Sequence, residues 1–189
     1  MERLDADARR ATLIAATIEV MLQKGFARAT TRDVAARLSI GRGLIHHYFD
    51  SWDALQRAAF EAVCIAAQTE AEAALAGLEN CAALDALLAL LVADPQDAHW
   101  RLVADVWDEA RIDHELARMH IGFSRWWRER LTSILQPIMS SPARANDAAW
   151  RLLALADGLS ANVLLAESAI NRCEAMRLLR EAARIELDA

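Results

Sequence analysis

The segment between residues 30 and 49 contains two short amphipathic stretches separated by a turn, and this pattern most restricts the fold of the chain. Thr30 and Asp33 have the spacing of a capping box, which predicts that a helix begins here. The apolar residues that follow fall on one side of that helix: Val34, Ala35 and Leu38. Residues 39–41, Ser-Ile-Gly, are typical of a turn, so a second helix is expected after them.

The second helix divides its side chains between two faces. Burial of Ile45, Tyr48 and Phe49 against neighbouring helices is expected to leave a polar face exposed near its N-terminal end. That face carries Arg42, Gly43, His46 and His47. Two short helices arranged in this way form a helix-turn-helix, whose second helix enters the major groove of DNA. The pattern therefore predicts a DNA-binding motif at about residues 30–49.

With the helices before and after it, this segment resembles the N-terminal domain of the TetR family of transcriptional regulators. The resemblance rests on Thr31, Val34-Ala35, Ile40, Gly43, Ile45, Tyr48-Phe49 and Leu55 at the family's spacing. The run Gly-Leu-Ile-His-His-Tyr-Phe at 43–49 is most similar to the BetI-like subgroup. Three residues depart from the family pattern: Ser39 replaces a glycine, Gly41 a serine and Trp52 a phosphate-contacting lysine.

The resemblance and the helix geometry together imply roles on DNA. Arg42 is placed for a base edge or a phosphate, and His46 and His47 for contacts in the groove, although simple packing of His46 is equally consistent with the pattern. Gly43 permits close approach of the backbone. The remaining contacts are expected from Thr31 and Tyr48 to phosphates, and from Arg32 to either a base or a phosphate. Arg9 and Arg10, near the start of the first helix, fit phosphate contacts or a solvated surface equally well.

The charge of the chain is unevenly distributed. The whole chain has a net charge of −6. Residues 1–60 hold nine Lys or Arg and seven Asp or Glu, whereas residues 61–189 hold twelve and twenty, so the two parts carry +2 and −8. Only the N-terminal third is therefore expected to lie on DNA, with an affinity that weakens steeply with salt because it depends on phosphate contacts.

Several other functional classes are not supported by the sequence. There is no His-Glu-x-x-His, Walker-type glycine loop, Gly-x-Ser-x-Gly or cysteine pair at zinc spacing, so neither an enzyme nor a metal or cofactor site is expected. Three widely separated cysteines, Cys64, Cys81 and Cys173, are interpreted as reduced packing residues. The chain has no long apolar run and no signal-peptide pattern at its start, so a cytoplasmic protein is expected.

The rest of the chain shows helical periodicity and no alternating strand pattern, which predicts an all-α fold of about nine helices. Two domains are expected: a three-helix DNA-binding domain at 1–52 and a helical ligand-binding and dimerisation domain at 53–189. Capping patterns at Asp94-Pro95, Ser141-Pro142 and Asn171 with Glu174 mark helix starts. The expected helices cover about 7–24, the two short helices within 30–49, and then 52–77, 83–93, 95–111, 113–138, 142–167 and 171–187.

Two apolar stripes in the last two helices indicate a homodimer, because they can build a four-helix bundle with a second copy. The residues expected at the dimer interface are Leu152, Ala156, Leu159, Val163, Met176 and Leu179. An apolar stripe that packs within one chain is the alternative. The run Ala-Asp-Gly-Leu-Ser-Ala-Asn at 156–162 also resembles the C-terminal domains of the TetR family, which implies a dimer that holds two DNA-reading helices about 34–36 Å apart.

Five of the six tryptophans follow the DNA-binding segment and lie near carboxylates. Aromatic rings with a carboxylate form cages for organic cations such as quaternary ammonium groups, which agrees with the effectors of the BetI-like subgroup. The candidate ligand-binding residues are Trp100, Trp107, Glu109, His114, Phe123, Trp127, Trp150 and Asp157. The alternative is that the rings are large core residues. Trp126 and Trp127 are adjacent and point in different directions, so at most one is expected to line a pocket.

These observations predict a dimeric, sequence-specific, DNA-binding transcriptional regulator. By the resemblance it is a repressor that a small effector, cationic or aromatic, releases from its operator. The alternative that the residues leave open is a helical protein-interaction or ligand-binding module that has lost DNA binding, because Trp52 cannot supply the charge of the usual lysine.

Overall fold

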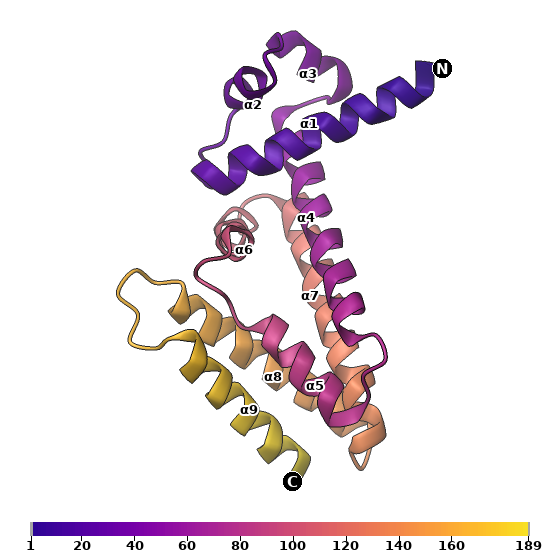
Figure 1. Cartoon of the computed structure of the whole chain (residues 1–189), viewed down its shortest axis with the longest axis vertical. Coiled ribbons are helices and arrows are strands. Elements are labelled where there is room, and N and C mark those ends of the chain that lie inside the picture. Colours follow the sequence, from indigo (N-terminus) through magenta and orange to yellow (C-terminus); the bar gives the residue numbers. More distant parts are fainter. Residues whose placement is uncertain (1, 189) are drawn as a thin grey trace. The chain divides into compact units, whose positions relative to one another are not determined.

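A computed structural model describes residues 2–188, and these residues form helices and connecting turns without a strand. The expectation of an all-α chain with about nine helices is confirmed for this range. Figure 1 labels the α-helices in chain order. They are α1 (Glu2–Lys24), α2 (Thr31–Leu38), α3 (Arg42–Tyr48), α4 (Trp52–Leu75), α5 (Asn80–Leu91), α6 (Ala98–Glu109), α7 (His114–Leu135), α8 (Pro142–Val163) and α9 (Arg172–Asp188), with a 3₁₀ turn at Gln136–Ile138.

The chain folds as two compact units whose limits differ from a single boundary near residue 52. The first unit comprises the residues up to Ala67 together with Arg101–Met119, and the second comprises Gln68–Trp100 and His120–Ala189. Most of α6 and the start of α7 therefore belong to the same unit as the three N-terminal helices. The long helix α4 contributes residues to both units.

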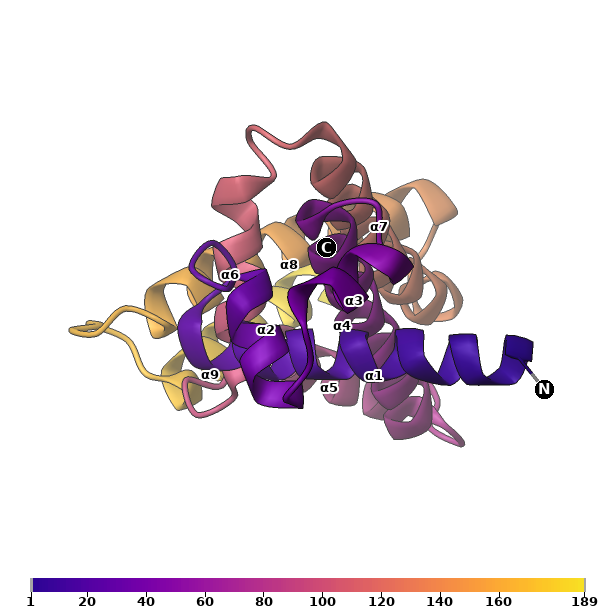
Figure 2. The same ribbon diagram turned by 90° about the horizontal axis from the view of Figure 1, so that it is seen from above.

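In the first unit, α2 and α3 pack with α1 around a small apolar core. Figures 1 and 2 show α2 and α3 on the same side of α1, with the N-terminal turns of α1 extending past both. The large, fully buried side chains of α1, α3 and α4 in this core are Leu13, Met21, Ile45, Leu55 and Phe60. Because α2 and α3 are so short, this burial rather than intrinsic helix propensity holds them in place.

The turn between α2 and α3 depends on Ser39, which has the left-handed backbone conformation with φ 55° and ψ 41°. Its N–H group donates hydrogen bonds to carbonyls at the end of α2. Only glycine adopts this conformation without strain, and other residues lose about 1 kcal/mol there. The glycine that related sequences carry at this position is therefore explained, and the serine of this chain keeps the same turn.

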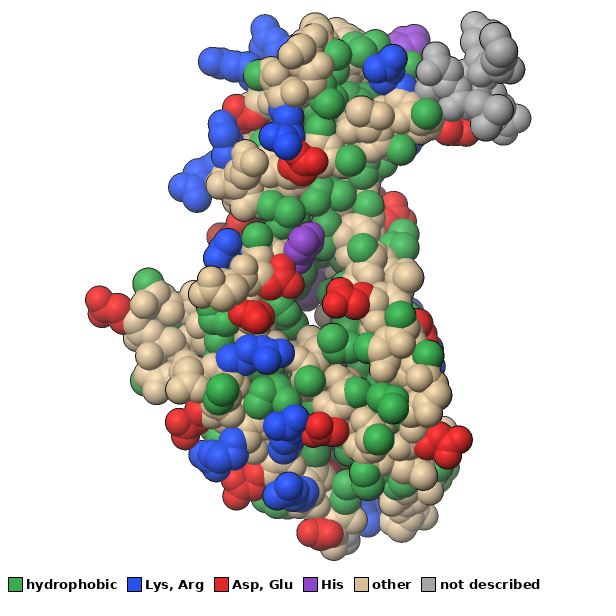
Figure 3. All heavy atoms as spheres, in the orientation of Figure 1, with side chains coloured by type: hydrophobic (Ala, Val, Ile, Leu, Met, Phe, Trp, Pro, Cys, Tyr) green, Lys and Arg blue, Asp and Glu red, His purple; other side chains and the backbone are tan. Residues whose placement is uncertain are grey.

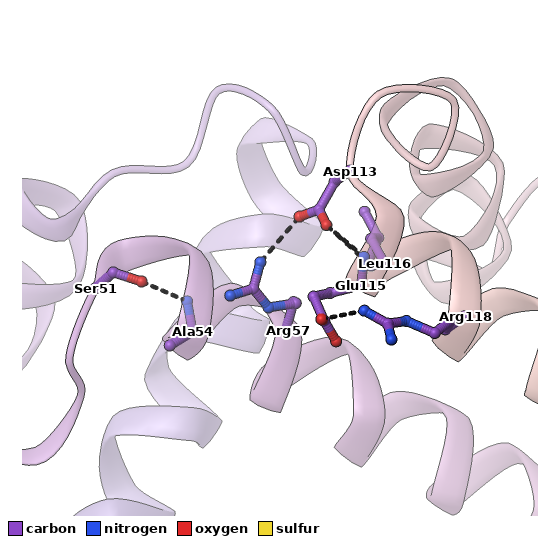
Figure 4. Close-up of polar contacts among 7 residues, drawn as sticks. All are labelled: Ser51, Ala54, Arg57, Asp113, Glu115, Leu116 and Arg118. Atoms are coloured by element: carbon purple, nitrogen blue, oxygen red, sulfur yellow. Dashed lines mark hydrogen bonds and ion pairs between the residues drawn. The ribbon is translucent and has the colours of Figure 1, made fainter.

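Most predicted helix starts are confirmed by capping hydrogen bonds. Thr30 and Asp33 form both bonds of the capping box, and the hydroxyl oxygen of Ser51 accepts a bond from the N–H of Ala54 (Figure 4). The Oγ of Ser141 and the Oδ1 of Asn171 accept bonds in the same way at the starts of α8 and α9.

Three expected helix starts were wrong, and the first of them is that of α5, which begins at Asn80 and not near residue 83. Asp94-Pro95 forms a turn and does not begin the helix. Helix α6 starts at Ala98, where the Asp97 carboxylate accepts a bond of 2.8 Å from the N–H of His99. Helix α1 begins at Glu2 and not near residue 7.

In the second unit, α8 packs against α5 and α9. The hydroxyl of Ser160 on α8 donates to the carbonyl of Leu91 (3.1 Å) and accepts from the N–H of Ala93 (2.9 Å), which satisfies one backbone group at the end of α5 and one just after it. Figure 1 shows α8 and α9 side by side, joined by the loop that runs through residues 164–171. Along the described residues, no helix is long and apolar enough to cross a membrane.

Candidate nucleic-acid interface

Helix α3 presents a polar face with few attachments to the rest of the chain. Ile45 is fully buried and Phe49, the residue that ends the helix, is nearly so. The exposed positions recur at i, i+1, i+4 and i+5, which is one face of a helix: Arg42, Gly43, His46 and His47. Tyr48 is half-buried, and its ring meets the edge of His47 at a centroid distance of 5.0 Å. The predicted division of α3 into a buried and an exposed side is confirmed, apart from this intermediate position of Tyr48.

Gly43 lies in the centre of this exposed face. A Cβ added there meets no atom within 4 Å, and the residue does not have a positive φ. Neither packing nor backbone conformation within the chain therefore requires a glycine. Glycine lowers helix stability by up to about 1 kcal/mol relative to alanine. A glycine at this position therefore suits the close approach of another molecule to the helix backbone.

The charges near α3 are partly neutralised. Lys24 forms an ion pair of 2.6 Å with Asp33, and Arg37 pairs with Glu19. Arg32 and Arg42 are exposed and make no ion pair among the described residues. Figure 3 shows blue Lys and Arg side chains over the part of the surface that α2 and its neighbours occupy. Two unpaired arginines on neighbouring helices give this face the positive charge that phosphate binding requires.

The other candidate contacts lie on α2 and at the start of α4. Thr31 is half-buried at the first position of α2, next to exposed Arg32. Trp52 is half-buried at the first position of α4. An indole ring at this position offers an N–H donor but no charge.

A pocket of about 510 Å³ lies in the first unit. It is lined by residues of the α1–α2 turn, α4 and the α6–α7 region, namely Phe26, Asp53, Gln56, Arg57, Glu109, Ile112, Asp113, His114, Glu115 and Leu116. Figure 4 shows Arg57 of α4 and Asp113 pointing toward each other at its wall, with 3.0 Å between Nη1 and Oδ2. Backbone N–H groups of α7 and Arg57 lower the pKa of the Asp113 carboxyl. Of the eight candidate ligand residues, the pocket brings together Glu109 and His114 only.

The remaining ligand candidates are divided between the units. Trp107, partly exposed, belongs to the first unit, whereas the other five belong to the second: Trp100, Phe123, Trp127, Trp150 and Asp157. In the second unit, Trp127 is buried and its ring has edge contacts with Phe123 (5.9 Å) and Trp126 (4.9 Å). These three aromatic residues of α7 form one cluster, which we call the α7 aromatic cluster.

Asp157, in the second unit, has a carboxyl pKa far from its ordinary value. It lies on α8, and burial raises its pKa to about 6. It makes no hydrogen bond or ion pair among the described residues. A desolvated carboxylate without a partner gains free energy from any cation placed beside it.

Trp150 differs from the other candidates because its side chain faces outward. It is 56% exposed, and the guanidinium of Arg128 lies over its ring at 5.1 Å from the centroid. The ring is therefore on the surface of α8 and not inside a cage in the isolated chain.

The six residues predicted at the dimer interface have little surface exposed in the single chain. Leu152, Ala156, Val163, Met176 and Leu179 are buried within the chain, and Leu159 is half-buried. The apolar stripes that they form pack α8, α9 and α5 together. In the single chain these residues therefore belong to its internal core, which was the alternative interpretation. A side chain such as Leu152, which is 1% exposed in one chain, has no surface left to bury against a second copy.

The cysteines correspond only partly to the expectation. Cys64 is buried, and burial raises its thiol pKa to about 12, which makes it unreactive. Cys81 and Cys173 are exposed near the starts of α5 and α9, so they are not packing residues. No group of three potential metal ligands occurs among the side chains that the structure describes.

Comparison with known proteins follows the two parts of the chain. Residues 13–59 match the model of bacterial regulatory proteins of the tetR family, and residues 81–188 match the model described as BetI-type transcriptional repressor, C-terminal. The chain is 29% identical over 180 residues to the HTH-type transcriptional regulator BetI of Burkholderia thailandensis, with 93% of this chain and 91% of the relative covered.

Solved structures share the fold. A transcriptional regulator from Rhodococcus sp. Rha1 superposes with a TM-score of 0.82 at 22% identity, over 95% of this chain and 96% of that one. A regulator from Saccharomonospora viridis, crystallised in complex with choline, superposes with a TM-score of 0.83 at 18% identity, over 94% and 96%. The proteins that match are transcriptional regulators, which confirms that the chain is not of an enzyme class. The helix-turn-helix of α2 and α3 and the matching C-terminal region thus place the chain in the TetR family of transcriptional regulators, with a C-terminal domain of the BetI type.

Proposed function

We propose that the chain is a homodimeric repressor that reads an operator with its two copies of α3 and leaves it when a small organic cation binds. The observation that carries the DNA-binding part is the exposed face of α3. Arg42 and His46 project from it without a hydrogen bond or ion pair among the described residues, and Gly43 between them is required by nothing in the chain. Side chains of these types form bidentate or single hydrogen bonds to base edges and phosphates.

The proposed division of labour follows the predicted domains. Residues 1–52 carry the contacts to DNA, through Thr31, Arg32 and the exposed residues of α3, and residues 53–189 carry effector binding and dimerisation. A regulator of this kind acts in the cytoplasm, where the operator is.

Three observations support a cationic effector. Asp157 is a desolvated carboxyl without a partner, and the α7 aromatic cluster belongs to the same compact unit. Aromatic rings and carboxylates are the groups that bind quaternary ammonium ions. A regulator with the same fold holds choline in its crystal structure. Effector binding shifts the protein away from its DNA-bound state only by the difference in affinity between the two states.

For the dimer we propose the outward face of α8 and α9 in place of the buried stripes. Trp150, Ala154, Gly158 and Ala161 are not buried and recur at intervals of three or four along α8, so they share one face. On α9, Ile185 is 64% exposed. A row of small residues beside exposed large apolar ones suits the close approach of a second copy, and such apolar surface is seldom left open in a monomer.

The test begins with duplexes selected from a random pool by the purified chain. We expect fluorescence anisotropy to show tight binding of a selected duplex, steep weakening with salt, and release when choline is added. Arg42→Ala with His47→Ala should abolish this binding and leave the dimer intact. Arg111→Ala with His99→Ala removes the same two residue types from exposed positions elsewhere and should have no effect. A dimer that binds no duplex even at low salt would overturn the proposal in favour of an interaction module.

A further inference from the structure

We propose that Arg10 of α1 is a positioning residue that sets the angle of α3, and thereby the sequence specificity of the chain. This inference rests on the proposed DNA-binding role of α3. Arg10 is separated from the end of α3 by 38 positions of sequence, yet its Nη1 donates a hydrogen bond of 2.9 Å to the carbonyl oxygen of Tyr48. Its guanidinium also lies over the ring of Phe49, with Cζ 4.0 Å from the centroid.

Both contacts of Arg10 are made at the C-terminal end of α3, where carbonyl groups lack partners within the helix. Tyr48 is the last residue of α3, and the last carbonyls of a helix have no partner within it. Arg10 satisfies one of them with a charged donor. It also covers Phe49, a side chain that is buried on its other sides. The C-terminal end of α3 is thus attached to α1 by a hydrogen bond and by a cation–π contact.

The length of α3 makes this attachment important for specificity. Seven residues extend over roughly 10 Å, so a shift at one end moves every side chain of the helix. His46 and His47 lie in the last turn, next to the carbonyl that Arg10 holds. Base-edge hydrogen bonds are sensitive to displacements of this size, whereas contacts to the phosphate backbone tolerate them and are independent of sequence. Loss of Arg10 should therefore weaken binding to the selected duplex more than binding to an unrelated one.

A direct phosphate contact of Arg10 is the competing explanation, and it has a different signature. A residue that neutralises one phosphate contributes about 0.9 to the slope of log affinity against log salt, for every DNA sequence. Lysine would replace it, because only a charge is needed. The attachment of α3 instead needs the planar guanidinium, which stacks and donates at the same time.

The experiment compares Arg10→Ala, Arg10→Lys and Arg9→Ala with the wild type. Arg9 is exposed, makes no hydrogen bond or ion pair among the described residues and lies on the same helix, so its removal reports the effect of lost charge alone. Dissociation constants are measured for the selected duplex and a scrambled one at several salt concentrations. Amide hydrogen exchange of residues 44–49 is measured in the free proteins, which requires no DNA.

We expect both Arg10 variants to bind the selected duplex about tenfold more weakly, as the loss of one charged hydrogen bond implies. Binding to the scrambled duplex and the salt slope should match Arg9→Ala for Arg10→Ala and the wild type for Arg10→Lys, because lysine keeps the charge. Exchange at 44–49 should accelerate in both Arg10 variants and not in Arg9→Ala. Arg10→Lys that binds like the wild type, an equal loss on both duplexes, or unchanged exchange would each overturn the inference. If the wild type selects no duplex, the proposed function fails, and the exchange measurement still decides whether Arg10 holds α3.

Discussion

The carboxylate of Asp105 accepts a hydrogen bond of 3.1 Å from the backbone N–H of Phe26, a residue 79 positions earlier in the sequence. The carbonyl of Phe26 accepts a second bond, of 2.8 Å, from Nε2 of buried Gln56. Both backbone groups of one residue in the α1–α2 turn are therefore held by side chains, one from α6 and one from α4. This turn is therefore where α6 is attached to the helix-turn-helix part of the chain.

The first prediction concerns this attachment. Asp105→Ala should lower the free energy of unfolding by about 1 to 2 kcal/mol, because it leaves the partly buried N–H of Phe26 without an acceptor. Asp105→Asn should cost less, since its amide oxygen can still accept. Urea unfolding measures both. Asp108→Ala is the matched control on the same helix: its ion pair with Arg111 is exposed, so removal should change stability little.

A double substitution checks the geometry. Gly25 has φ +88°, and an added Cβ would lie 2.9 Å from Oδ2 of Asp105. Gly25→Ala should therefore destabilise the chain through both backbone strain and this close contact. In the Asp105→Ala background the contact is gone, so the cost of Gly25→Ala should be smaller. Additive effects of the two substitutions would contradict the contact between them.

How much of this fold could be predicted depends on the range of the interactions. The caps at Thr30, Ser141 and Asn171 were predictable because the groups that bond are three positions apart. Asp94-Pro95 has the same local pattern but forms a turn, and Asp97 supplies the cap instead. The bonds of Phe26 to Asp105 and Gln56 join distant segments, so periodicity and spacing contain no signal for them.

The second prediction concerns Gly43. Gly43→Ala should leave the fold intact or stabilise it by up to about 1 kcal/mol, since its added methyl group meets nothing in the chain. It should weaken binding of a selected duplex at least tenfold if DNA approaches the backbone here. Thermal unfolding and fluorescence anisotropy measure the two effects. Gly122→Ala, on α7 and equally open, should stabilise the chain without any change in DNA affinity; equal DNA affinity of the two variants would argue against a close approach at Gly43.

The third prediction is a pH dependence that Asp157 causes. Burial raises the pKa of this carboxyl from 3.8 to about 6, so the folded chain binds the proton more tightly than the unfolded chain. The wild type should therefore lose stability as the pH rises from about 4 to about 6 and remain level above that. Asp157→Asn removes this loss and should be more stable than the wild type at pH 7 by up to about 3 kcal/mol, with little difference at pH 4. Denaturant unfolding at the two pH values measures it.

Choline binding separates the functional from the structural role of this carboxyl. Asp157→Asn should bind choline much more weakly at pH 7, because the neutral amide offers a cation no charge. Asp147→Asn, an exposed position on the same helix, should retain both the pH dependence of stability and the choline affinity of the wild type. Full choline affinity in a folded Asp157→Asn protein would show that the cation binds elsewhere.

The candidate sites were less predictable than the helices that carry them. The exposed face of α3 was predictable because the apolar residues Ile45 and Phe49 mark the buried side of this short helix, and the polar residues lie opposite them. The packing partner of the stripes of α8 and α9 could not be decided from the sequence, because an apolar stripe has the same periodicity whether it faces α5 of its own chain or a second copy. Trp150 and Trp127 likewise look alike in the sequence, although one is exposed and the other buried.

The last prediction distinguishes the buried stripe from the proposed dimer face. Ile185→Glu places a charge on an apolar side chain that is exposed in one chain, so the protomer should stay folded while the dimer dissociates at micromolar concentration. Ile121→Glu, at a similarly exposed isoleucine of α7, should remain dimeric. Leu152→Ala should instead lower the free energy of unfolding by about 2 to 5 kcal/mol, because it leaves a cavity in the core. Analytical ultracentrifugation and urea unfolding measure these outcomes. If Leu152→Ala were a folded monomer and Ile185→Glu stayed dimeric, the dimer interface would instead lie at the apolar stripe that contains Leu152.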